Sequence, residues 1–165
     1  MNQAAFHDLY KRYAPDVYRF ALWLSGDSAE AEDITSETFV RAWAHSRKIQ
    51  TETIKAYLFT IARNLYLQQH RRQKRQVSLA QAAQQTYSGP QAVVENRLAL
   101  TDVLQQLQKM PESDRAALVL RVQHGLPYAE IARVLGISLS AAKVKVHRAR
   151  LKLTAVRLAW EVSEK

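Results

Sequence analysis

The chain contains no cysteine, and only four glycines and four prolines, among its 165 residues. The absence of cysteine excludes disulfides, thiolate zinc sites and redox chemistry at sulfur. Few glycines and prolines leave few points at which a helix must stop, and no stretch shows the sustained apolar–polar alternation of strands. No apolar run approaches the roughly 20 residues of a membrane-spanning helix, and no signal-peptide pattern opens the chain. The sequence therefore predicts an all-α protein of the cytoplasm, without membrane insertion.

Acidic residues are outnumbered, since 24 Lys and Arg stand against 15 Asp and Glu, for a formal net charge of +9. A basic excess of this size favours a polyanionic partner, either nucleic acid or an anionic membrane surface. The charge is unevenly distributed. Residues 27–37 hold five acids and no Lys or Arg, whereas residues 63–75 hold five Lys or Arg and no acid. One face of the first half therefore suits a protein partner and another suits nucleic acid.

Apolar residues at helical spacing divide the first half into helices. Residues 6–13 carry the first apolar stripe, and Pro15 is expected to begin a second helix, where its missing N–H costs little. Gly26 is expected to end that helix. The next helix is predicted to begin at Ser28, with acids in its first turn, and to run to about His45.

The chain is predicted to form two small helical bundles joined by a flexible linker. A polar loop, residues 46–53, precedes a long helix that carries an apolar stripe and then a basic end, which closes a first domain at residues 1–75. Residues 76–92 are rich in Gln and Ala and are interrupted by Ser-Gly-Pro, a composition typical of a linker. Residues 93–165 form the second domain, in which Pro111 is expected to begin a helix.

Residues 128–152 have the spacing of a helix-turn-helix. Ala132 is small enough to let two helices approach, Gly136 four residues later can adopt the left-handed turn conformation, and Ser138 can cap the second helix. That helix is strongly basic, as DNA binding requires; the alternative is a solvated basic face without a partner. Its first exposed residues are expected to face base edges and its later ones phosphates. The predicted DNA-binding residues are Ser140, Lys143, Val144, Lys145, His147, Arg148, Arg150 and Lys152.

The segment 57–75 interleaves aromatic residues with a basic run. Aromatic rings and an asparagine can capture unstacked bases while arginines neutralise phosphates, a combination suited to single-stranded or melting DNA. Taken singly, Tyr57, Phe59 and Tyr66 fit core or boundary positions better than stacking platforms. The candidate DNA-binding residues of this segment are Tyr57, Arg63, Asn64, Arg71, Arg72 and Arg75.

No grouping of residues indicates catalysis. Glu30, Asp33 and Glu37 share a helix face, but no histidine lies at a helpful spacing, and magnesium sites built of oxygen ligands usually need a substrate phosphate as well. The five histidines are scattered, and no serine, histidine and carboxylate group together. We therefore expect no enzyme activity, no metal and no cofactor. A metal-dependent nuclease that uses these acids is a minor alternative.

Three segments carry a family resemblance. Residues 31–43 (AEDITSETFVRAW), 53–72 (TIKAYLFTIARNLYLQQHRR) and 104–153, which contains the helix-turn-helix, follow one another in this order. They resemble, respectively, the polymerase-binding helix, the −10 segment and the −35 domain of the extracytoplasmic-function (ECF) sigma factors of the sigma-70 family. The likeness covers nearly the whole chain. Val144 stands where the family commonly has a polar residue, which leaves the promoter sequence open.

The resemblance implies a sigma factor that binds core RNA polymerase, through the β′ clamp and β flap, and directs it to promoter DNA. Asn64 and the polar loop would capture bases of the melted −10 strand, with arginines on the backbone, while the basic helix of the second domain enters the major groove at −35. An anti-sigma factor would regulate the protein and could hold it at the membrane, away from the nucleoid. The residues implied in polymerase binding are Asp33, Glu37, Phe39, Arg41 and Trp43.

A stand-alone transcriptional regulator is the main alternative, because response-regulator output domains carry a similar helix-turn-helix. Such a regulator would not need the helix at residues 31–43 or the basic, aromatic helix at residues 53–75. Tight, sequence-specific duplex binding without polymerase would support it.

Overall fold

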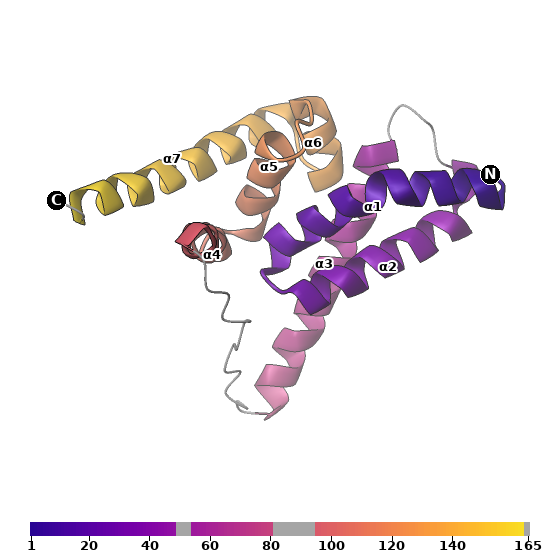
Figure 1. Cartoon of the computed structure of the whole chain (residues 1–165), viewed down its shortest axis with the longest axis horizontal. Helices are drawn as coiled ribbons and strands as arrows, with labels where there is room; N and C mark the ends of the chain where they lie inside the picture. Colours follow the sequence, from indigo (N-terminus) through magenta and orange to yellow (C-terminus); the bar gives the residue numbers. More distant parts are fainter. Residues whose placement is uncertain (49–53, 81–94, 164–165) are drawn as a thin grey trace.

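The structure is a computed structural model that describes residues 1–48, 54–80 and 95–163. These ranges contain seven α-helices, one short 3-10 helix and no strand, so the all-α prediction is confirmed. Parts of the predicted polar loop and of the predicted linker lie outside the described residues. The helices are α1 (Gln3–Ser25), α2 (Ser28–Ala44), α3 (Ile54–Ala80), α4 (Glu95–Gln108), α5 (Glu112–Val122), α6 (Tyr128–Leu135) and α7 (Leu139–Ser163), with the 3-10 helix η1 at Ser46–Lys48 (Figure 1).

The first helix runs through Pro15, and the expectation that a second helix begins there is wrong. Leu9 and Val17, on either side of the proline, are both buried in the same core, and a single helix keeps the two in register. Pro15 itself faces solvent, and its carbonyl accepts a hydrogen bond from Arg19 Nε at 3.4 Å. Packing therefore overrides the local cost of proline. Gly26, with φ +69°, ends the helix as predicted.

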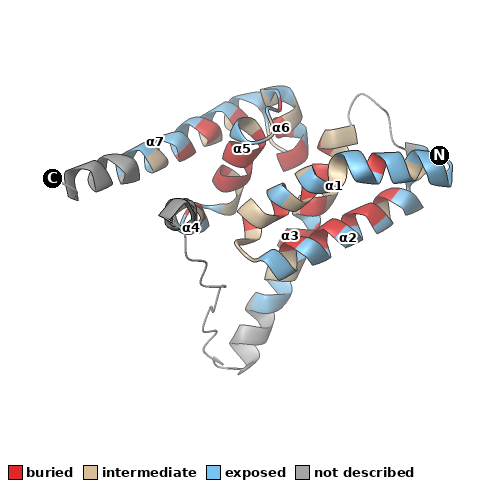
Figure 2. Ribbon diagram, viewed as in Figure 1, coloured by how far each residue is buried: buried red, intermediate tan, exposed pale blue. Residues whose placement is uncertain are grey.

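Helices α1, α2 and α3 pack together as the first bundle. The buried residues of these helices are coloured red on the ribbons in Figure 2. Phe20 of α1 and Phe59 of α3 are both fully buried, with ring centroids 4.9 Å apart, and Ile34 of α2 is buried with them. Helix α2 begins at Ser28, as predicted, and is capped by Asp27, whose carboxylate accepts from two backbone N–H groups.

Helices α5, α6 and α7 form the core of the second bundle, and α4 packs against α5 and α7. The turn between α6 and α7 has the predicted construction. Gly136 has φ +66°, and Ser138 Oγ accepts a hydrogen bond at 3.1 Å from the backbone N–H three residues later. Ala132 is buried at the crossing of the two helices, and Ala142 and Val146 bury the inner face of α7. The helix-turn-helix prediction is thereby confirmed in its geometry.

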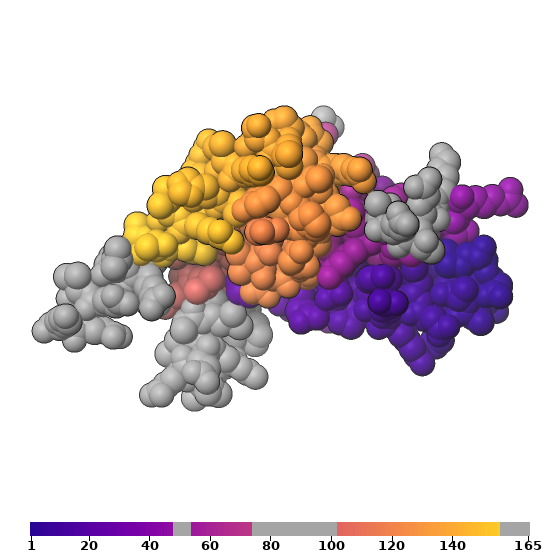
Figure 3. Space-filling model, turned by 90° about the horizontal axis from the view of Figure 1, so that it is seen from above, coloured from indigo at the N-terminus to yellow at the C-terminus, as the bar shows by residue number. Residues whose placement is uncertain are grey.

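The two bundles lie against each other. Helix α3 packs on α6, and α1 packs on α4 and α5. The buried residues of the described ranges form one continuous apolar cluster that extends through both bundles. In the space-filling view the later helices, orange and yellow, adjoin the indigo and magenta helices of the first bundle (Figure 3). This packing was not predicted from the sequence.

Candidate nucleic-acid interface

Helix α7 presents most of its predicted DNA-binding residues to solvent. Seven of the eight are exposed: Ser140, Lys143, Val144, His147, Arg148, Arg150 and Lys152. Leu139 and Val144 are also about half exposed, at 46% and 52%, at the beginning of the helix. Apolar groups at such positions can contact thymine methyl groups, while the cations contact phosphates and guanine edges. The face thus has the composition of a surface that reads a DNA major groove.

The remaining predicted residue, Lys145, points into the protein. Its ammonium lies 3.0 Å from Ser113 Oγ and 3.5 Å from Asp114 Oδ1, both in the first turn of α5. Arg148 Nη1 lies 3.8 Å from the other carboxylate oxygen of Asp114. Sequence reasoning missed this carboxylate, which is fully buried. Its only sequence signal is an acid two positions before the apolar run of α5, which begins at Ala116.

The ring of Tyr128 on α6 contacts one cation from α5 and one from α7. The Arg121 guanidinium lies 4.3 Å from the centre of the Tyr128 ring, and Lys143 Nζ lies 5.9 Å from it. Cations at these distances are attracted to the ring face. Lys143 therefore leaves α7 on the side that faces α6.

The predicted −10 residues lie on two different faces of α3. Asn64 and Arg71 are exposed and seven residues apart, which places them on one face of the helix. Arg72 is exposed beside them, whereas Tyr57 is half-buried. The side chain of Arg75 lies outside the described residues. The structure therefore brings Asn64, Arg71 and Arg72 together on one surface.

Arg63 lies on the other face of α3, where it joins the two bundles. Its Nε and Nη2 donate to the two carboxylate oxygens of Glu112, both at 2.8 Å. The side chains are only 12% and 20% exposed. A bidentate, partly buried pair of this kind is stronger than a surface ion pair. This arginine is thus occupied by a residue 49 positions away, in α5.

Two further polar contacts cross the same boundary. Arg115 of α5 is buried and donates from Nη2 to the Tyr66 hydroxyl of α3 at 2.9 Å. Burial raises the pKa of that tyrosine. Gln108 of α4 donates from Nε2 to the carbonyl of Leu24 at 3.0 Å, one of the free carbonyls at the end of α1. Side chains of the second bundle therefore satisfy polar groups of the first.

His124, between α5 and α6, lies at the boundary with two phenylalanines of the first bundle. Its ring centre is 4.7 Å from that of Phe59 and 6.1 Å from that of Phe20. Nε2 is buried and has no hydrogen-bond partner among the described residues. Burial lowers the pKa of His124 to about 4; the charged groups that act on it are Asp16, Arg19 and Lys55, all in the first bundle.

Helix α2 carries the predicted polymerase-binding residues. Asp33, Glu37 and Trp43 are exposed, and Arg41 Nε donates to Glu37 at 3.1 Å. Phe39 differs from these, because its side chain is 3% exposed. It packs edge-on against rings of α1 and so supports the surface from beneath.

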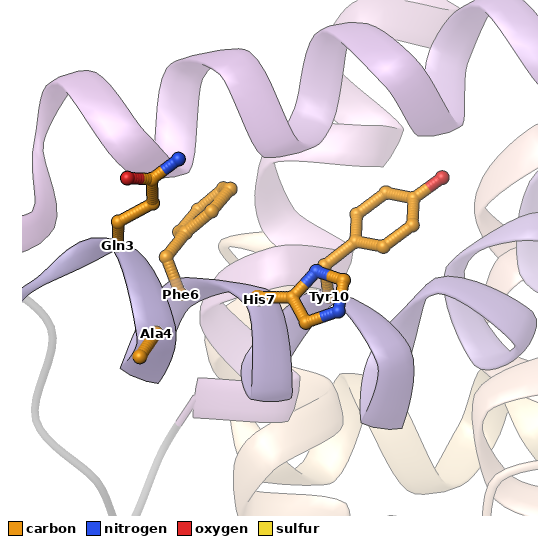
Figure 4. Close-up of a pocket in the computed structure, with 5 residues that line it drawn as sticks. All are labelled: Gln3, Ala4, Phe6, His7 and Tyr10. Atoms are coloured by element: carbon orange, nitrogen blue, oxygen red, sulfur yellow. The ribbon is translucent and has the colours of Figure 1, made fainter.

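An apolar patch adjoins this acidic surface. Val40 is 61% exposed and Trp43 45% exposed, and sequence reasoning did not single out the valine. Phe6 lies edge-on to Trp43, with centroids 4.7 Å apart. Phe6 and Tyr10 extend from α1 toward α2 (Figure 4) and line a surface pocket together with Gln3, Ala4 and His7. Acidic and apolar side chains thus lie side by side, a combination suited to a protein partner.

Of the three acids that could suggest a metal centre, Glu30 and Glu37 have other partners. Glu30 lies 3.1 Å from His70 Nε2 of α3, and burial raises the pKa of this carboxyl group. Within the described ranges, no three His, Asp or Glu side chains come together as metal ligands. None of the helices in these ranges is long and apolar enough to cross a membrane.

Two helical bundles, one with a basic helix-turn-helix and the other with an exposed acidic and apolar helix, define the class of promoter-recognition factors. Two family models match the chain: Sigma-70 region 2 over residues 9–76 and Sigma-70, region 4 over residues 100–153.

Curated relatives cover almost all of the chain. The ECF RNA polymerase sigma factor SigM of Bacillus subtilis is 32% identical over 154 residues, which are 90% of this chain and 93% of SigM. The corresponding SigL of Mycobacterium tuberculosis is 35% identical over 164 residues, 94% and 91% of the two chains. The chain belongs to the ECF sigma factors of the sigma-70 family. It is a sigma factor, which binds core RNA polymerase and directs it to promoters.

Solved structures extend the likeness to the arrangement of the bundles. The sigma factor RpoE from Bartonella quintana, in complex with the anti-sigma factor NepR, is 26% identical, with a TM-score of 0.77 over 92% of this chain and 95% of that one. CnrH, in complex with the cytosolic domain of CnrY, is 27% identical, with a TM-score of 0.71 over 96% and 90%. Scores of this size over both bundles indicate that the bundles pack together in a similar way.

Proposed function

We propose that each bundle makes one promoter contact and that the first also holds the polymerase. In this proposal residues 1–75 bind the β′ clamp through α2 and read the −10 element through α3. Residues 93–165 read the −35 element through α7 and contact the β flap, and residues 76–92 connect the two. The exposed basic face of α7 is the observation that supports this division, because it would give a DNA-binding surface to the bundle that lacks α2.

Melting of the −10 element would be driven by binding alone. A protein shifts an equilibrium toward the state that it binds more tightly, so contacts of Asn64 and of Arg71 with the single strand favour the open promoter. No nucleotide-hydrolysing motif is needed for this step. The chain itself is not an enzyme in this proposal, since RNA synthesis belongs to the polymerase.

The two promoter contacts require the bundles to separate. The −35 and −10 elements are about 25 base pairs apart, roughly 85 Å at about 3.4 Å per base pair. A bundle of about 75 residues is roughly 30 Å across, so two bundles in contact have centres only about 30 Å apart. Arg63, held by Glu112, becomes available to DNA on the same separation. The packed arrangement therefore represents an inactive state.

We infer that an anti-sigma factor favours that packed state. The support is the similarity of this arrangement to that of RpoE in complex with NepR. A partner that binds only the packed form shifts the equilibrium by its difference in affinity between the two forms. The free sigma factor would act in the cytoplasm at the nucleoid, where polymerase and promoters are, and a membrane-bound anti-sigma factor would hold it at the membrane.

Transcription from a genomic promoter library tests the proposal. Purified core polymerase with this protein should produce start sites that core polymerase alone does not. A matched variant, Val40→Glu, places a like charge beside the acids of α2 and should abolish these starts while the protein stays folded. If no new start site appears, the sigma-factor role is refuted. Tight specific duplex binding without polymerase would favour a stand-alone regulator.

A further inference from the structure

The carboxylate of Asp114 lies within ion-pair distance of two cations of α7. Asp114 lies in the first turn of α5 and is fully buried. Lys145 Nζ lies 3.5 Å from Oδ1 and Arg148 Nη1 lies 3.8 Å from Oδ2. Both cations come from α7, three residues apart and therefore on one face of that helix. No other cation of the described residues lies within ion-pair distance of this carboxylate.

The N-terminal end of α5 explains why Lys145 depends on the carboxylate of Asp114. The first turn of a helix carries partial positive charge, which favours an acid and disfavours an ammonium group. Lys145 nevertheless lies there, with an additional contact to Ser113 Oγ at 3.0 Å. Because the helix end opposes it, the ammonium depends on its contacts with Asp114 Oδ1 at 3.5 Å and with Ser113 Oγ to stay in this place. An unpaired charge of either sign would be unfavourable in so buried a place.

Two anchors on one helix face restrict rotation of the helix about its own axis. Side chains at the surface of a helix lie about 5–6 Å from that axis, so a rotation of about 20° moves them by about 2 Å. A displacement of this size breaks a hydrogen bond to a base edge. Lys143, Val144 and His147, on the exposed side of α7, would all move together.

We propose that Asp114 is a positioning residue that sets the rotation of α7 in the major groove through Lys145 and Arg148. In this reading Lys145 is an internal cation and makes no DNA contact. Arg148, whose side chain is 53% exposed, keeps free N–H groups for a phosphate. The inference rests on the proposed function, since it concerns how the −35 element is read.

The test uses holoenzyme, formed from core polymerase and the full chain, on two probes. One probe is a promoter duplex from the start-site mapping, and the other is the same duplex with a scrambled −35 element. Affinity for both is measured over a range of salt concentrations. Discrimination between the probes reports base reading, and the slope against salt reports the number of phosphate contacts.

Lys145→Ala and Asp114→Asn should each reduce discrimination between the probes by about tenfold, the effect of a lost base contact, and leave the salt slope unchanged. The double variant should lose no more than either single variant, because both remove the same anchor. Arg150→Ala is the matched control: it should flatten the slope by about 0.9 and keep the discrimination, as a phosphate contact does.

Two results would overturn the inference. If Lys145→Ala flattens the salt slope as Arg150→Ala does, the lysine contacts a phosphate. If discrimination is unchanged in both Lys145→Ala and Asp114→Asn, the anchor does not position the helix. Lys145→Met, which keeps the apolar stem, covers the case that Asp114→Asn unfolds, and circular dichroism reports folding for each variant. Failure of the proposed function looks different, since the wild-type holoenzyme itself would then not discriminate.

Discussion

Acidification is expected to separate the two bundles, because His124 has to be neutral in its place beside Phe20 and Phe59. The pKa of this histidine is lowered from 6.5 to about 4 by burial. A lowered pKa means that the packed form gains stability from the neutral ring above pH 6.5 and loses it as the pH falls toward 4. Lowering the pH from about 7.5 to about 5.5 should therefore weaken the contact by about 1.4 kcal/mol, or tenfold.

The effect is measured as a difference between the wild type and His124→Phe. Phenylalanine keeps an aromatic ring of similar size against the two phenylalanines but does not titrate. Urea unfolding at the two pH values should show an extra loss of about 1.4 kcal/mol in the wild type. Carboxylates elsewhere titrate equally in both proteins and cancel in the comparison.

Fluorescence energy transfer separates domain opening from global unfolding. The chain has no cysteine, so Ala29→Cys on α2 and Ala155→Cys on α7, both exposed, give two unique labelling sites. Energy transfer should fall on acidification in the wild type and change little in His124→Phe. The same pH response in both proteins would show that His124 does not control the contact, and the reasoning from its burial would be refuted.

Three further outcomes are expected. Glu112→Gln should weaken the contact between the two bundles by about 1–2 kcal/mol, since the Arg63 pair is only partly buried. The variant should therefore associate faster with core polymerase in stopped-flow measurements, and unchanged kinetics would contradict this. Trp43→Ala should weaken polymerase binding at least tenfold in a fluorescence titration, with α7 DNA contacts unaffected as the internal control. Gly136→Ala should lower the unfolding free energy by about 1 kcal/mol, because alanine adopts the φ of +66° at this position only at a cost. A Cβ there meets no atom within 4 Å, so no steric clash adds to that cost. A neutral effect would mean that the backbone of the turn relaxes.

Local patterns were sufficient to predict the helices and the turn of the second bundle. Ala132, Gly136 and Ser138 specify a helix crossing, a left-handed residue and a cap within seven positions, and each has the predicted geometry. The inner face of α7 follows from the spacing of Ala142 and Val146 in the same way. These features depend on neighbours a few residues away, which a sequence displays directly.

Contacts between distant residues were not predictable in this way. Pro15 was expected to begin a helix, and only the core shared by Leu9 and Val17 shows why it does not. The pair between Arg63 and Glu112 joins residues 49 positions apart, and nothing in either local sequence indicates a partner. Lys145 similarly resembles every other cation of its helix until the fold places Asp114 beside it.

In the proposed function the position of Arg63 links packing of the two bundles to DNA binding. Glu112 offers this arginine two carboxylate oxygens at 2.8 Å, in the bidentate geometry that a guanidinium also uses for a phosphate. One guanidinium cannot make both interactions at once, so the predicted −10 contact of Arg63 can form only after Glu112 has released it. In the proposed function Glu112 therefore competes with DNA for Arg63. Opening, as proposed, would exchange this internal anion for promoter phosphates. The net free energy of that exchange would be smaller than either interaction alone, which would keep the step reversible.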